Sequence, residues 1–80
     1  MTKTISLCDY VALIVDGEEE RLPNKPRKLW EALGWDIDND PNAKECASII
    51  TQELFCFRRC DISALTGGKH TVVIEWRYND

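Results

Sequence analysis

The sequence has little histidine and no long hydrophobic run, and each shortage excludes a class of function. His70 is the only histidine, so a cysteine nucleophile would have a single candidate base. The longest apolar stretch, residues 10–15, is far too short to cross a bilayer. Residues 1–6 carry one lysine and no apolar run before a small-residue cleavage site, unlike a secretory signal. We therefore expect a soluble, cytoplasmic protein with no membrane partner.

The length of 80 residues leaves room for one hydrophobic core, so residues 1–80 are expected to form a single compact domain. Hydrophobic residues make up 44% of the chain and charged residues 30%, which is an ordinary globular balance. A chain this short buries only about 60–65% of its unfolded surface, so a second copy could add stability. Both a monomer and a homodimer remain open.

The first third of the chain predicts two strands. From Ile5 to Val15, apolar residues occupy both faces of a pleat, so this strand is expected to be central or covered on both sides. Asp16 and Gly17 then form a dipeptide that tolerates positive φ and favours a hairpin turn. Residues 18–22 are predicted to form a short, charged edge strand.

Two helices are predicted next. The first spans about residues 25–33, with Asn24 as its cap and Gly34 as its stop. The second runs from Pro41, capped by Asp40, to about residue 57. A helical wheel places six residues of the second helix on one broad apolar face. They are Cys46, Ile49, Ile50, Leu54, Cys56 and Phe57.

Two side chains of the second helix do not fit this wheel. Glu53 falls inside the apolar face, so either a cation pairs with it or the face is open to solvent or to a partner. Phe55 falls on the opposite side, which predicts that it is exposed, that another element covers it, or that the helix ends before it. The wheel alone leaves these alternatives open.

A turn at residues 66–69 separates a short run, residues 61–65, from an alternating strand at residues 70–78. The element order is therefore strand, short strand, helix, helix, strand, strand. This order predicts an α+β fold in which an antiparallel sheet of three to four strands has two helices packed on one face.

Acidic residues alternate between residues 36 and 40, as in a calcium-binding loop, but the pattern departs from that motif. Pro41 stands where the sharp turn needs glycine, and Ala47 stands where the loop needs a bidentate glutamate. We therefore interpret residues 36–40 as a solvated acidic loop that favours the positive end of the following helix.

The four cysteines are expected to be reduced thiols that pack as small hydrophobes, since a cytoplasmic protein lies in a reducing compartment. Zinc is the alternative, but only Cys56 and Cys60 are closely spaced, and Cys8, Cys46 and His70 would have to complete the site. A disulfide is a further alternative in an oxidising medium. We expect no metal, no cofactor and no catalytic residues, and hence not an enzyme.

The formal charge of −4 disfavours nucleic acid as the main partner and draws attention to two acidic blocks. Their carboxylates could occupy sites that a basic protein keeps for phosphates, and an exposed tryptophan beside one block could anchor the contact. The candidate partner-binding residues are Asp16, Glu18, Glu19, Glu20, Trp35, Asp36, Asp38 and Asp40. The alternative is a nucleic-acid-binding regulator that uses Lys25, Arg27, Lys28, Arg58 and Arg59.

In size, acidic balance, lack of catalytic motifs and strand-helix-strand plan, the chain resembles the small phage-encoded inhibitors of bacterial defence, of which the anti-CRISPR proteins are the best known. The resemblance is one of type over the whole chain, and the class shares no signature from which residues could be carried over. It implies a protein in the host cytoplasm that docks on a nucleic-acid-binding defence complex. Such a protein blocks target recognition by steric and electrostatic occupation.

Overall fold

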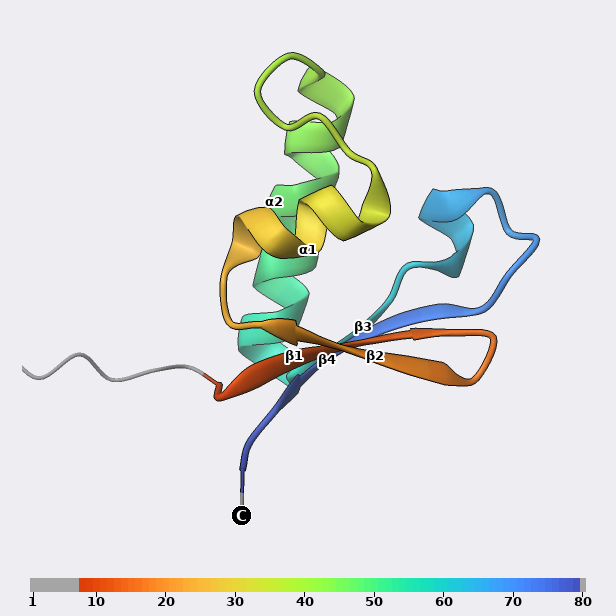
Figure 1. Cartoon of the computed structure of the whole chain (residues 1–80). Helices are drawn as coiled ribbons and strands as arrows, with labels where there is room; N and C mark the ends of the chain where they lie inside the picture. The colour runs from red at the N-terminus through yellow and green to blue at the C-terminus, as the bar shows by residue number, and fades with distance from the viewer. Residues whose placement is uncertain (1–7, 80) are drawn as a thin grey trace, which may run out of the picture.

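The computed structural model describes residues 8–79, which form four strands and two α-helices with a short 3-10 helix before the last strand (Figure 1). The predicted strand residues 5–7 lie outside the described part. The elements are β1 (Tyr10–Val15), β2 (Glu18–Pro23), α1 (Pro26–Leu33), α2 (Pro41–Phe57), β3 (Arg59–Asp61), η1 (Ser63–Thr66) and β4 (Val72–Arg77).

The strands form one antiparallel sheet in the order β2-β1-β4-β3, and both helices pack on one face of it (Figure 1). The α+β prediction is therefore confirmed, and β1 is central as expected. Leu13 of β1 lies opposite Ile74 of β4, and both belong to the core that Leu29 and Ile50 complete from the two helices. The core is a single layer of apolar side chains between sheet and helices.

The turn between β1 and β2 has the conformation that the sequence predicts. Asp16 and Gly17 have φ values of 51° and 85°, and two positive values in succession define the turn that matches the twist of a hairpin. Aspartate tolerates this left-handed region better than most residues because its short side chain can bond locally. The turn sets the register, so that Val15 faces Glu18 across the hairpin.

The second face of the sheet carries long charged side chains in place of another layer. Arg21 lies over the ring of Tyr10 at 4.0 Å, and Arg77 pairs with Glu19 at 2.9 Å. Ala12, on this same face, is fully buried. The aliphatic stems of long cationic side chains can cover small apolar residues while their charged ends stay in water.

The two helices begin differently. Asp40 caps α2 as predicted, because its carboxylate accepts a hydrogen bond from the backbone N–H of Asn42 at 2.9 Å. The predicted cap of α1 is wrong: Lys25 occupies that position without a side-chain hydrogen bond. Asn24 is turned away, and its amide donates to the backbone carbonyl of Cys8 at 2.7 Å. The Asn24 side chain, which the capping preference predicts to bond to the start of α1, forms a tertiary contact instead.

The buried side of α2 is rotated relative to the predicted face. Ile50 and Leu54 are buried as expected, but the rest of the buried stripe consists of Ala43 and Ala47. Ile49, Cys56 and Phe57, predicted to be on the apolar face, are exposed. The buried stripe is therefore narrower, and carries smaller side chains, than the face that the helical wheel predicts.

Both unusual side chains of α2 are now explained. Glu53 is exposed, so its carboxylate is not buried among apolar groups. Phe55 is 55% exposed, and its ring meets the ring of Trp76 edge-on with centroids 5.3 Å apart.

Within residues 8–79 neither helix combines the length and the apolar composition that crossing a membrane requires.

Candidate binding site

The C-terminal end of α1 forms one wall of the candidate site. Gly34 takes the left-handed conformation, with φ of 77°, and its N–H donates to the carbonyl of Glu31. The N–H of Trp35 donates to the carbonyl of Trp30 at 2.9 Å. These two bonds define a Schellman motif, in which the chain reverses and the residue after the glycine packs on the last helical turn. The indole of Trp35 is thereby brought onto that of Trp30.

The connection from α1 to α2 is held by its own acidic residues. The carboxylate of Asp36 accepts hydrogen bonds from the backbone N–H and the side-chain amide of Asn39, at 3.2 and 2.9 Å. The N–H of Asp40 donates to the carbonyl of Asp36 at 2.9 Å. These bonds make residues 36–40 a compact, ordered turn, so the predicted acidic loop has a defined shape.

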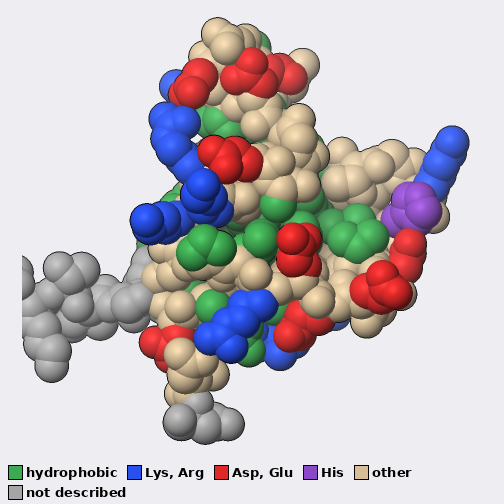
Figure 2. Space-filling view, viewed as in Figure 1, with side chains coloured by type: hydrophobic (Ala, Val, Ile, Leu, Met, Phe, Trp, Pro, Cys, Tyr) green, Lys and Arg blue, Asp and Glu red, His purple; other side chains and the backbone are tan. Residues whose placement is uncertain are grey.

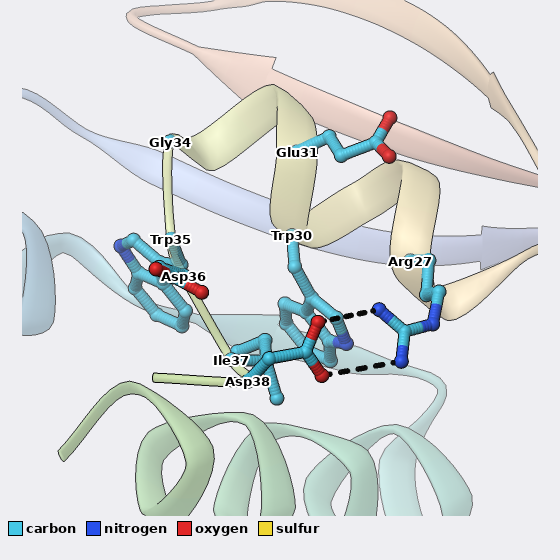
Figure 3. A pocket seen from close by; sticks show the side chains of 8 residues that line it. All are labelled: Arg27, Trp30, Glu31, Gly34, Trp35, Asp36, Ile37 and Asp38. Carbon is cyan, nitrogen blue, oxygen red and sulfur yellow. Dashed lines mark hydrogen bonds and ion pairs between the residues drawn. The ribbon is translucent and has the colours of Figure 1, made fainter. Parts of the chain in front are cut away.

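A hollow of about 380 Å³ lies between the end of α1 and this connection (Figure 3). It opens to solvent, and its lining combines two indoles, one aliphatic side chain, three carboxylates and one guanidinium. The lining residues are Arg27, Trp30, Glu31, Gly34, Trp35, Asp36, Ile37 and Asp38.

The two indoles give the hollow a flat aromatic wall. The rings of Trp30 and Trp35 are almost parallel, with an interplanar angle of 4° and centroids 5.9 Å apart. Trp30 is only 7% exposed and anchors the wall in the core, whereas Trp35 is half-buried and presents part of its ring to the hollow. The predicted anchor, Trp35, therefore does lie at a concave surface.

Across the hollow, Arg27 forms a bidentate ion pair with Asp38, with both N–O distances at 3.2 Å (Figure 3). The guanidinium holds the pKa of the Asp38 carboxyl below its ordinary value through these hydrogen bonds and through its charge. Both side chains are exposed, Arg27 at 76% and Asp38 at 65%. Water and competing ions therefore reach the pair, and it adds little to stability.

The first acidic block begins at the other end of the molecule, where β1 turns into β2. The carboxylate of Asp16 accepts a hydrogen bond from the backbone N–H of Thr71 at 3.0 Å and contacts Nδ1 of His70 at 2.7 Å. These two contacts, the backbone one first, lower the pKa of Asp16. Asp16 thus fastens the hairpin turn to the segment that enters β4.

The strand geometry distributes the three glutamates of β2 over both faces of the sheet. Glu19 points to the face without helices and pairs with Arg77. Glu18 and Glu20 point to the helix side, because they lie opposite Val15 and Leu13. Both are exposed at the sheet edge that β2 forms.

The basic residues of the alternative hypothesis do not share one face. Arg27 is paired with Asp38, and Lys28 lies 3.5 Å from Glu31. Arg59 lies on the sheet face opposite to the helices, because it pairs in register with Glu75. The remaining two residues are Lys25, at the start of α1, and Arg58, which donates a hydrogen bond to the hydroxyl of Tyr78.

The cysteines are dispersed over the fold. Burial raises the pKa of the thiols of Cys8 and Cys60, which favours their protonated, less nucleophilic form. Cys46 is half-buried and Cys56 is exposed on α2. No disulfide joins cysteines in the described part of the chain. Within residues 8–79, no three His, Cys, Asp or Glu side chains lie where they could hold a metal ion.

Part of the lining of the hollow is predictable from the sequence. Trp35, Asp36 and Asp38, which are predicted to bind a partner, line the hollow, whereas Asp40 lies outside its lining and caps α2. The contributions of Arg27 and Trp30 were not foreseen. The Trp30–Trp35 contact had a sequence signal, because a hydrophobic residue after a helix-ending glycine packs against the last helical turn. The pairing of Arg27 with Asp38 had none.

We compared the chain with protein-family models, curated proteins and solved structures, and nothing matches it. The function of the chain is therefore inferred from the site itself.

Proposed function

We propose that the chain is a non-enzymatic binding protein that inhibits a bacterial defence complex of the CRISPR-Cas type. In this proposal an acidic face docks on the DNA-recognition surface of the complex. The observation behind it is that acidic side chains form two groups on one face of the molecule, with hydrophobic side chains exposed between them and Lys and Arg side chains beside them (Figure 2). One group lies at the far end of the helical layer, and the other lies along the sheet toward the β1–β2 turn.

An apolar centre with a charged rim is the usual composition of a surface that recognises another protein. The centre loses water on docking and supplies affinity, while the rim selects a partner of opposite charge. The net charge of −4 adds long-range attraction to a basic surface and repulsion from nucleic acid. A basic DNA channel is the complementary partner, and the resemblance in type to anti-CRISPR proteins agrees with it.

A binding role is also supported by the chemistry of the hollow. It is open to water, and among the described residues its lining consists of carboxylates, indoles, one aliphatic side chain and one guanidinium, with no serine, cysteine or histidine. His70, the one histidine, contacts Asp16 at an exposed turn. A surface of this kind acts by occupying space and charge, and the same surface needs no cofactor.

The test is a gel-shift titration in which guide-loaded CRISPR effector complexes of several types bind labelled target DNA with and without the protein. We expect at least one complex to lose DNA binding, and Glu18→Lys or Glu20→Lys to weaken this inhibition. Glu53→Lys is the matched control. It makes the same charge change on α2 near Cys60 of β3, at the sheet edge opposite to β2.

Two results would contradict the proposal. In the first, every effector complex keeps its DNA binding at saturating concentrations of the protein. In the second, Glu53→Lys weakens inhibition as much as Glu20→Lys, which would mean that overall charge and not the β2 edge determines docking.

A further inference from the structure

The hollow at the end of α1 combines two kinds of surface that recognise the same chemical group. The indole of Trp35 offers an aromatic face, which attracts cations through its quadrupole. The carboxylates of Asp36 and Asp38 line the same hollow and attract cations by charge and hydrogen bonding (Figure 3). A planar cation that stacks and donates paired hydrogen bonds satisfies both, and in proteins that cation is the guanidinium of arginine.

The protein itself shows how a guanidinium binds one of these carboxylates. The guanidinium of Arg27 already reaches from α1 to the rim of the hollow and forms two hydrogen bonds with the carboxylate of Asp38 (Figure 3). Because both side chains are largely exposed, this pair can exchange with an external guanidinium at little cost. Asp36 keeps acceptor capacity as well, since each carboxylate oxygen has two lone pairs and Asn39 uses only part of them.

We propose that the hollow receives an arginine side chain of the partner protein, which stacks on Trp35 and displaces Arg27 from Asp38. This inference rests on the proposed function and names the group that the acidic face recognises. Proteins that bind DNA carry arginines on their recognition surface to contact phosphates. Occupation of such an arginine removes a phosphate contact, so the hollow would link docking directly to loss of DNA binding.

The probe is a blocked Gly-Arg-Gly peptide, and the measurement is the shift of the indole Nε1–H signals in ¹⁵N NMR spectra of the full chain. We expect the Trp35 signal to move most and the Trp76 signal to stay. The matching citrulline peptide has the same shape without the charge, and we expect it to bind about two- to fivefold more weakly or not at all, the scale of one exposed cation–aromatic contact. A lysine peptide should bind more weakly than the arginine peptide, because its ammonium does not stack.

Two variants test whether the peptide displaces Arg27 or is only attracted by the overall negative charge of the protein. Arg27→Ala removes the internal competitor and should tighten binding of the arginine peptide. Arg59→Ala makes the same charge change on the sheet face opposite to the helices and should leave binding as it is.

The inference is wrong if the Trp35 signal does not move, if citrulline and arginine peptides bind equally, or if Arg27→Ala and Arg59→Ala change affinity by the same factor. Each of these results leaves the gel-shift test unaffected. Conversely, if the peptide binds but no effector complex is inhibited, the arginine site is supported and the proposed inhibitor function is contradicted.

Discussion

The indole of Trp35 lies parallel to the indole of Trp30, with centroids 5.9 Å apart, because Gly34 between them turns the chain back on α1. One backbone conformation therefore ends the helix and also builds the aromatic wall of the candidate site. Stability of this helix end and shape of the hollow should change together.

Gly34→Ala tests this coupling. Alanine in the left-handed region is strained by roughly 1–2 kcal/mol, so the variant should unfold at lower urea concentration. The near-ultraviolet circular dichroism of the stacked indoles should weaken as well. Gly67→Ala is the control, because Gly67 also has positive φ, 101°, but lies in the connection before β4. It should lose comparable stability with the indole signal intact. An unchanged indole signal in Gly34→Ala would separate the two roles.

Two neighbouring isoleucines test which side of α2 is buried. Ile50 is fully buried, so Ile50→Ala should lower the free energy of unfolding by about 2–5 kcal/mol. Ile49 is 48% exposed, so Ile49→Ala should cost less than about 1 kcal/mol. Urea denaturation of the two variants measures the difference. Equal losses would mean that α2 buries the broad apolar face predicted from the helical wheel.

Asp16→Asn should change how stability depends on pH. The pKa of Asp16 is lowered in the folded protein, chiefly by the N–H of Thr71 and then by His70. Its carboxylate therefore stabilises the fold above the ordinary pKa of aspartate, and this contribution is lost as the pH falls through the lowered pKa. The stability difference between the wild type and Asp16→Asn should be largest near neutral pH and vanish in acid.

The control for this pH profile is Glu18→Gln, which removes a nearby carboxylate that has no ion pair among the described residues. Its difference from the wild type should stay small across the same range. A pH-independent loss in Asp16→Asn would show that the shape of the side chain, and not its charge, holds the turn to Thr71.

The turns, helix ends and caps that depend on residues close together in the sequence were predicted correctly. Asp16 and Gly17 form the predicted hairpin turn, Gly34 ends α1, and Asp40 caps α2, because each depends on backbone preferences or bonds within a few residues. The cap of α1 failed for the opposite reason. Asn24 is held by the carbonyl of Cys8, a residue 16 positions away.

The candidate site, too, is only partly predictable from the sequence. Two acidic blocks are visible in the sequence, but β2 sends Glu19 to one side of the sheet and Glu20 to the other. The hollow needs Arg27 to meet Asp38 across 11 positions, a pairing that no spacing rule specifies. Carboxylates that share a run of sequence therefore need not share a surface.

By itself, the sequence determined the order of the first two strands and the two helices, the hairpin turn, the cap of α2 and the antiparallel α+β plan, since these follow from side-chain periodicity and from the conformations that glycine, proline and aspartate favour. Only the tertiary structure decided which side of α2 is buried and which charges meet. A helical wheel compares the faces of one helix, whereas burial depends on where the other elements pack against that helix. In the fold the side of α2 with Ala43 and Ala47 is buried, and Ile49 and Phe57 stay in solvent.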